Sequence, residues 1–316
     1  MTITRRILLA SGLLAATGVR AQQPAADAPL PVVASFSILA DFIREIGGDR
    51  VSVSSLVGRD ADAHGFEPSP ADAARLAQAR LVVVNGLGFE GWMDRLVKAS
   101  GSKAPVVVAS RGVKPIAAPG GGHAHGHGHG HGHSHGHAHD HDADPHAFQS
   151  VANAKLYVAA IRDALVAADG AGKAVFEAQA TRYLGELDRL DAEIKAEIAR
   201  IPQARRRVIT DHDAFAYFGA AYGIRFVAPR GVSRSGDVSA KDVARIVRQV
   251  KADKIPALFF ENVADPRLIE QIARESGAKI GGKLYSDALS AEGGPAPTYP
   301  ALMRHNAKTL AGALAE

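Results

Sequence analysis

Short apolar runs alternate with amphipathic stretches along most of the chain. The apolar runs of the first third lie at 31–36, 51–57, 81–85 and 105–109. Helical patterns between them cover 38–46 and 70–79, and Ser69 and Asp72 suit the start of the second helix. Strands that are apolar throughout are typical of a sheet covered on both faces. Because strands and helices alternate, we predict βαβ units and a mainly parallel sheet.

The middle of the chain holds the longest helical pattern. Apolar side chains recur at 3- and 4-residue intervals over about 171–201, charged residues lie between them, and Pro202 ends the pattern. About 30 residues at 1.5 Å each make a rod of roughly 45 Å. A shorter helical pattern at 148–168 precedes it. Further strands are predicted at 207–210, 224–228, 257–261 and 278–285, with helices from Phe215, Ala240, Pro266 and Tyr299. We therefore predict two α/β lobes on either side of a long helix.

The first residues have the pattern of a cleavable export signal. Arg5 and Arg6 precede an apolar run at 7–16, and the predicted cleavage site follows Ala21. The Arg pair also leaves a twin-arginine export route open. The chain has 37 Lys plus Arg and 33 Asp plus Glu, and removing 1–21 takes away three Arg and no acid, leaving 34 basic residues against 33 acidic ones. The basic charge belongs mostly to the leader, so it does not indicate a nucleic-acid partner.

The sequence has no Cys and 14 His. A chain without Cys must hold any metal through His, Asp or Glu. Ten of the histidines occupy alternate positions, mostly between Gly and Ala: His123, His125, His127, His129, His131, His133, His135, His137, His139 and His141. A segment of this composition cannot bury a core, so we expect a loop at 112–145. Its imidazoles would bind metal weakly as a collector or buffer, and an inert insertion is the alternative.

Four histidines lie outside the repeat. His64 and His146 precede predicted helices, His212 follows a predicted strand, and His305 lies inside the last helical pattern, where we expect a structural role. Ligand sites of open α/β sheets collect beyond the carboxyl ends of the strands, and Asp287 also follows a strand. An isolated His in such a place is more often a helix cap. The repeated setting nevertheless favours a metal site.

Carboxylates surround these candidate ligands in the sequence. Any of them could accept a proton from a ring nitrogen that does not bind metal, which would fix the tautomer of the imidazole. The candidates are Asp62, Asp144, Asp211, Asp213 and Glu261. A turn or cap role is the alternative for each of them.

Five short motifs carry a resemblance to a known family. They are DAHGFEPSP at 62–70, DPH at 144–146, HDAFAYF at 212–218, SAKD at 239–242 and YSD at 285–287. With them the chain resembles the solute-binding proteins of zinc ABC transporters, a group that includes manganese and iron binders. The resemblance implies two Rossmann-like α/β lobes joined by one long rigid helix, with one metal in the cleft between them. It assigns the metal to His64, His146, His212 and Asp287.

The predicted organisation follows from the pattern and the resemblance together. It comprises a signal peptide at 1–21, an N-terminal α/β lobe at 28–168 that contains the His-rich loop at 112–145, a linker helix at 169–202, and a C-terminal α/β lobe at 203–316. Because Cys is absent, we expect a periplasmic protein that is free after cleavage, without a lipid anchor. We also expect a monomer.

Zinc is the metal that the ligand set favours. Three imidazoles and one carboxylate suit the tetrahedral preference of Zn²⁺, whereas manganese favours more oxygen ligands. The expected function is capture of Zn²⁺ and delivery to an ABC permease. Its ATPase subunit would be a separate chain, because the phosphate-loop motif is missing, and a periplasmic zinc metallochaperone is a further candidate partner.

Two alternatives to a zinc-transport protein remain at this point. One is a binding protein for manganese or another divalent metal. The other is a zinc-dependent hydrolase that uses His64, His146 and His212 with water as the fourth ligand. Asp287 would close that fourth position and the His-Glu-x-x-His motif is missing, so we expect no enzyme and no catalytic residue.

Overall fold

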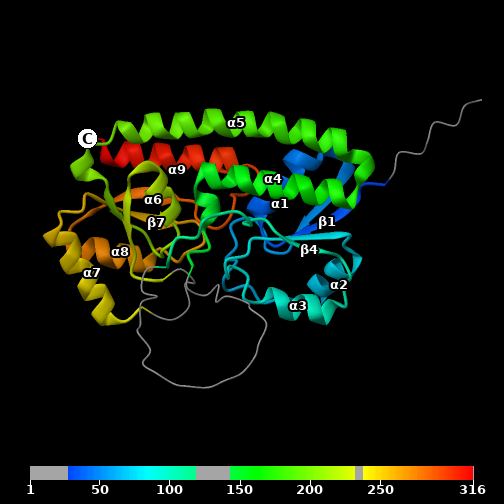
Figure 1. The fold of residues 1–316 in the computed structure, drawn as a ribbon. Helices are drawn as coiled ribbons and strands as arrows, with labels where there is room; N and C mark the ends of the chain where they lie inside the picture. Colours follow the sequence, from blue (N-terminus) through cyan, green and yellow to red (C-terminus); the bar gives the residue numbers. More distant parts are fainter. Residues whose placement is uncertain (1–27, 119–142, 232–237, 316) are drawn as a thin grey trace, which may run out of the picture.

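The computed structural model describes residues 28–118, 143–231 and 238–315. The predicted signal peptide at 1–21 and the histidines from His123 to His141 lie outside these ranges. Two four-stranded sheets lie side by side, and the long helix α5 spans both of them (Figure 1). The predicted two-lobed α/β fold is thereby confirmed. In the described part of the chain, no helix is both long enough and apolar enough to cross a membrane.

The first sheet is parallel throughout and has the strand order β2-β1-β3-β4. Its strands are β1 (Leu30–Ala34), β2 (Val51–Ser55), β3 (Leu81–Val84) and β4 (Val106–Val108). Its helices are α1 (Ser37–Gly47), α2 (Pro70–Gln78) and α3 (Met93–Ser100). The Ser69 side chain accepts a hydrogen bond from the backbone of Asp72, so α2 begins where the sequence predicts. All four residues of β3 are buried, as expected for a strand covered on both faces.

The second sheet repeats this topology with the order β6-β5-β7-β8, again parallel. Its strands are β5 (Arg207–Ile209), β6 (Arg225–Val227), β7 (Ala257–Glu261) and β8 (Lys279–Leu284). Its helices are α6 (Ala216–Tyr222), α7 (Ala240–Ala252), α8 (Arg267–Ser276) and α9 (Tyr299–Leu314). His212 and Asp287 each lie three residues beyond the end of a strand, β5 and β8 respectively, so both side chains stay close to the end of the sheet.

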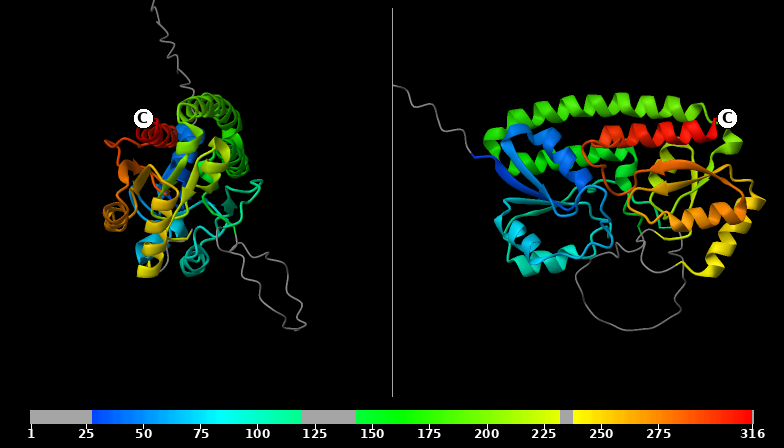
Figure 2. Two further views of the ribbon diagram at one scale, coloured as in Figure 1. Left: turned by 90° about the vertical axis from the view of Figure 1, so that its left-hand side faces the viewer. Right: turned by 180° about the vertical axis from the view of Figure 1, so that it is seen from behind.

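Helices α4 (Val151–Ala168) and α5 (Lys173–Ala199) connect the two sheets. With 27 residues, α5 is about 40 Å long at 1.5 Å per residue. Its buried stripe recurs every three or four positions and comprises Phe176, Ala180, Tyr183, Leu187, Leu190, Ile194 and Ile198. This stripe packs on α1 and α4 of the first half and on α9 of the second (Figure 2).

One apolar core runs through both halves. The larger cluster of buried side chains contains residues from β1, β3, α1, α4, α5, β7 and α9, whereas a smaller cluster lies under α7 and α8. Phe42 of α1 illustrates the continuity, because its ring lies 6.2 Å from that of Tyr183 in α5 and 4.8 Å from that of Tyr299 in α9. The two sheets are thus held by shared packing as well as by the connecting helix.

One helix and the starts of two others differ from the sequence-based expectation. Helix α3 was not predicted. The shorter helical pattern starts with a separate 3₁₀ turn at Ala147–Gln149, so α4 begins at Val151. The long pattern likewise starts with a 3₁₀ turn at Gly170–Gly172, where a Cβ on Gly172 would lie 2.5 Å from Arg50 Nε. Short 3₁₀ turns share helical spacing with the helix that follows them, so periodicity alone does not separate the two.

Candidate metal centre

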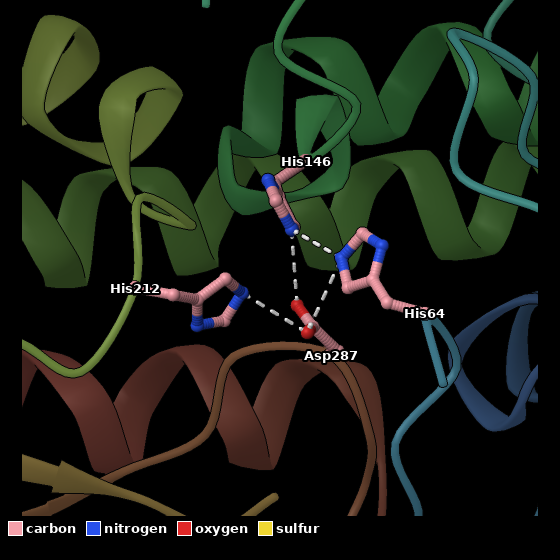
Figure 3. Close-up of side chains that lie close together, drawn as sticks. All are labelled: His64, His146, His212 and Asp287. Atoms are coloured by element: carbon pink, nitrogen blue, oxygen red, sulfur yellow. Dashed lines mark hydrogen bonds and ion pairs between the residues drawn. The ribbon is translucent and has the colours of Figure 1, made fainter. Parts of the chain in front are cut away.

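Three imidazoles and one carboxylate meet between the two sheets (Figure 3). His64 comes from the loop between β2 and α2, His146 precedes the 3₁₀ turn before α4, His212 follows β5, and Asp287 follows β8. One nitrogen or oxygen of each lies within 4.8 Å of those of the others. The side chains of His146, His212 and Asp287 are fully buried, and that of His64 is 5% exposed. The structure therefore brings together all four predicted ligands.

The spacing of these atoms suits a single ion. Nε2 of His64 lies 3.1 Å from Nε2 of His146. Asp287 Oδ2 lies 3.2 Å from His212 Nε2 and 3.7 Å from His64 Nε2, and its Oδ1 lies 3.4 Å from His146 Nε2. A tetrahedral ion with bonds of about 2.0–2.1 Å separates its ligand atoms by about 3.3 Å. The four side chains thus enclose a space of the size that such an ion needs.

Two carboxylates lie against the Nδ1 atoms of His146 and His212, on the side of each ring opposite the centre. Asp144 Oδ1 lies 2.8 Å from Nδ1 of His146, and it also accepts a hydrogen bond from the His146 backbone. Glu261 Oε2 lies 2.7 Å from Nδ1 of His212, and its Oε1 accepts from the backbone N–H groups of Asp211 and His212. A proton shared on the Nδ1 side leaves the Nε2 lone pair free to face the centre. Both rings are therefore oriented as metal ligands are.

The other carboxylates predicted to support the site have different partners. Asp62 accepts a hydrogen bond from the backbone of His64, which shapes the loop that carries this ligand. Asp211 is buried and forms an ion pair with Arg230 at 3.0 Å. Asp213 is partly buried, and burial raises its pKa to about 6 although His212 opposes the shift. Asp144 and Glu261 occupy the position that the tautomer argument requires.

The buried charges of the site depend on one another. Burial by itself raises the pKa of Asp287, but His212, His146 and His64 outweigh it and hold the pKa below its ordinary value. Burial lowers the pKa of His212, whereas Glu261 and Asp287 outweigh this effect and raise it to about 10. Within the described residues, neither carboxylate oxygen of Asp287 receives a hydrogen bond of ordinary geometry. A buried carboxylate in this situation favours a bound cation.

Buried polar side chains that the sequence analysis missed hold the backbone beside three ligands. Trp92 Nε1 donates to the carbonyl of Ala63 at 2.9 Å, next to His64. Asn85 Nδ2 donates to the carbonyl of Pro145 at 2.8 Å, next to His146, and Gln149 Nε2 donates to that of Ser286 at 2.6 Å, next to Asp287. A polar residue directly after an apolar run, such as Asn85 after β3, is the sequence feature that could have pointed to these side chains.

Two other rings differ in their relation to the centre: Phe89 lies against it and His305 does not. His305 Nε2 lies 2.9 Å from the carbonyl of Lys283, away from the centre, in agreement with the structural role expected for it. The ring of Phe89 packs edge-on against His64 and His146, with centroids 4.7 Å and 5.8 Å apart. This apolar wall excludes water from one side of the ligands.

Comparison with known proteins identifies the family. The model of a family described as the periplasmic component A of the zinc-uptake complex, ZnuA, matches residues 32–313. The chain belongs to this family. The manganese-binding lipoprotein MntA of Halalkalibacterium halodurans, a similar protein, is 33% identical over 287 residues, which cover 91% of this chain and 89% of MntA.

Two further relatives carry the names of other metals. The iron-binding protein YfeA of Yersinia pestis is 29% identical over 306 residues, which cover 96% of this chain and 93% of YfeA. The structure of the periplasmic zinc binding protein TroA from Treponema pallidum is similar with a TM-score of 0.80 at 27% identity, over 91% of this chain and 100% of TroA. The ZnuA family supplies the metal-binding proteins of ABC transporters, which work with a permease and an ATPase component. This member is therefore a divalent-metal solute-binding protein and not an enzyme.

The expected location needs a correction. Absence of Cys led to the prediction of a periplasmic protein without a lipid anchor, but several family members similar to this chain are named lipoproteins. The prediction is wrong because it inferred the lack of a lipid anchor from the lack of Cys alone, whereas these relatives are lipoproteins. The comparisons place proteins of this kind in the periplasm or at the cell surface, with lipid anchoring common among them.

Proposed function

We propose that this family member captures Zn²⁺ through His64, His146, His212 and Asp287 and delivers it to its ABC permease for import. The observation that carries this proposal is the convergence of three Nε2 atoms on one buried carboxylate at tetrahedral spacing. Nitrogen-rich sets of four ligands suit zinc, whereas manganese favours more oxygen ligands. The names of the relatives span manganese, iron and zinc, so the donor set of this chain is the basis for the choice.

Binding of the ion requires little movement of the ligand side chains other than His64. Asp144 and Glu261 already hold two imidazoles with Nε2 toward the ion. Asp287 supplies a negative charge that no ordinary hydrogen bond within the described residues satisfies. His64 is the one ligand of the four whose side chain contacts solvent, so the ion enters past its loop. Dehydration of the ion is offset by four bonds formed in a largely prepared site.

Metal competition tests the choice of zinc. The full chain, purified without chelating resin, is incubated with one equivalent each of Zn²⁺ and Mn²⁺, so that the two ions compete for the centre, and the retained metals are measured by elemental analysis. We expect zinc to be retained in large excess over manganese. Preferential retention of manganese would overturn the choice of metal and leave the divalent-metal function intact.

Substitution tests the ligands. We expect Asp287→Ala, and the triple variant His64→Ala, His146→Ala, His212→Ala, to lose tight zinc binding in calorimetric titration. His305→Ala is the matched control, since it removes an imidazole that faces away from the centre. Tight binding that survives Asp287→Ala would contradict the proposed ligand set.

We further propose that the histidines from His123 to His141 collect or buffer zinc near the centre. Ala117 and Ala143 form an antiparallel bridge, so the segment between them leaves and re-enters the fold at one point. Ala143 is three residues from His146. A chain anchored so close to a ligand would raise the local concentration of weakly held metal at the site.

A further inference from the structure

Asp60 has a backbone conformation that few residues other than glycine adopt. Its φ is 52°, and it lies four residues before His64 in the loop between β2 and α2. Its backbone N–H donates to the carbonyl of Leu289 at 2.9 Å, and its Oδ2 accepts from the backbone N–H of Ala291 at 2.9 Å. Its Oδ1 accepts from Asn262 Nδ2 at 3.1 Å. Every one of these partners belongs to the second half, so contacts between halves hold this residue in place.

Asn262 connects the same contact to Asp287. Its Oδ1 accepts from the backbone N–H of Ser286 at 3.3 Å, and its Nδ2 donates to the carbonyl of Ala288 at 3.2 Å. The side chain thus brackets the backbone on both sides of Asp287. The preceding residue, Glu261, holds the ring of His212. Residues 261 and 262 therefore support two ligands, and the Asp60 contact extends this support to the loop of a third.

We propose that the Asp60–Asn262 pair is a clasp that holds the loop of His64 against the loop of Asp287 and sets the rate at which the metal leaves. The proposal rests on the proposed function, because it takes these residues as ligands. His64 is the ligand of the four with solvent contact, so the ion leaves when its loop separates from Asp287. That separation breaks the clasp. Asp60 and Asn262 are positioning residues, because these contacts are with loops and with each other rather than with the ligand atoms.

A charge exchange tests the clasp in the full chain. The protein is loaded with less than one equivalent of Zn²⁺, and release to an excess of a chromophoric chelator is followed by stopped flow. Asn262→Asp keeps the acceptor for Ser286. It removes the Nδ2 donor to Asp60 and to the carbonyl of Ala288, and it places a like charge against Asp60. We expect release about five- to a hundredfold faster, the effect of losing about two hydrogen bonds.

The double variant Asp60→Asn, Asn262→Asp restores the contact with its direction reversed. The amide introduced at position 60 donates to the carboxylate introduced at position 262, and its oxygen still accepts from Ala291. We expect the release rate to return part of the way to that of the unmodified protein, because the contact with position 60 is restored and the bond to the carbonyl of Ala288 is not. A double variant that releases zinc as fast as Asn262→Asp, or a single variant with an unchanged rate, would overturn the clasp.

Glycine substitutions provide the matched control. Asp60→Gly keeps the left-handed backbone and removes both side-chain contacts, so we expect faster release. Lys254→Gly places the same residue at an exposed position with a similar φ of 49°, and we expect no change in rate. Asp287→Ala is measured alongside. If it retains tight binding, the proposed ligands are wrong; if it loses binding while the clasp variants release zinc normally, only the clasp is wrong.

Discussion

Glu261 combines two tasks at one residue. One carboxylate oxygen lies 2.7 Å from the His212 ring and the other accepts two backbone N–H groups, so the side chain fixes both the loop and the tautomer. We expect Glu261→Gln to weaken zinc affinity about 10- to 100-fold, the usual effect of losing a carboxylate behind a ligating histidine. Competition with a chelator of known affinity measures the change. The exposed Glu292→Gln is the control, and equal affinities of the two variants would contradict this role.

Zinc affinity should also depend on pH. The three imidazoles must be neutral and Asp287 ionised to bind the ion, so protons compete with metal. We expect the zinc dissociation constant to increase steadily as the pH decreases from about 7.5 to about 5. The pKa of His212, raised to about 10 by Glu261 and Asp287, leaves a proton for zinc to displace throughout this range. Calorimetric titration at several pH values, with buffers of different ionisation enthalpy, also counts the protons released. A dissociation constant that stays flat across this range would contradict the histidine ligands.

At the residue scale, the sequence predicted the four side chains that meet between the sheets better than it predicted the carboxylates that support them. His212 and Asp287 follow strands, and parallel topology brings such positions to one edge of a sheet. Glu261 and His212 are 49 positions apart in the sequence, so local residue spacing does not predict their contact. Asp62, Asp144, Asp211 and Asp213 all lie within two residues of a predicted ligand, and Asp144 lies against a ring nitrogen in the way predicted. Closeness in the sequence does not show which group each carboxylate faces.

At the scale of elements, a buried carboxylate joins α1 to α9. Asp41 Oδ2 accepts a hydrogen bond from the backbone N–H of Tyr299, at the start of α9. Burial raises the pKa of Asp41 from 3.8 to about 6, although the Tyr299 bond opposes the shift. The folded protein therefore binds this proton more tightly than the unfolded chain does. The stability that the group contributes is fully present below about pH 4 and is lost as the pH rises to about 6.

Asp41→Asn should remove this loss because the amide oxygen still accepts from Tyr299 without a buried charge. We expect the variant to be more stable than the unmodified protein by up to about 3 kcal/mol near pH 7, at 1.36 kcal/mol per pKa unit. Near pH 4 the two should be equally stable. Urea unfolding at both pH values measures the difference. Greater stability of the unmodified protein at pH 7 would show that Asp41 is stabilising in its charged form.

Elements with many repeats of their pattern were predicted more accurately than short ones. The buried stripe of α5 recurs through 27 residues, so its existence did not depend on any single position. Helix α3 has eight residues and buries only Met93 and Leu96, which is too little periodicity to separate it from a loop. In the turn at Ala147–Gln149, the carbonyl of His146 accepts a hydrogen bond from the backbone N–H of Gln149. Asp144 holds the backbone N–H of His146 at one end of the turn, and the loop of Asp287 accepts from the Gln149 side chain at the other. The local pattern of apolar and polar residues does not predict tertiary contacts of this kind.

At the scale of the whole molecule, the bridge between Ala117 and Ala143 makes the histidine repeat removable. Deletion of 123–141 leaves residues 118–122 and 142 between the bridged pair, which is enough for a short hairpin connection. We expect the deleted protein to keep one tight zinc site and to bind fewer ions in total. Calorimetry combined with metal analysis measures both. Loss of the tight site on deletion would mean that the repeat belongs to the primary centre.

The shared core also constrains how this family can diversify. Side chains of β1, α5, β7 and α9 lie in one apolar cluster, so neither half has a packed surface of its own to exchange. A chimera that combined the first half of this chain with the second half of a relative would juxtapose side chains that were never selected to fit, at a cost of several kcal/mol. Selectivity for a different metal is therefore more accessible through single replacements at the strand ends than through recombination of lobes.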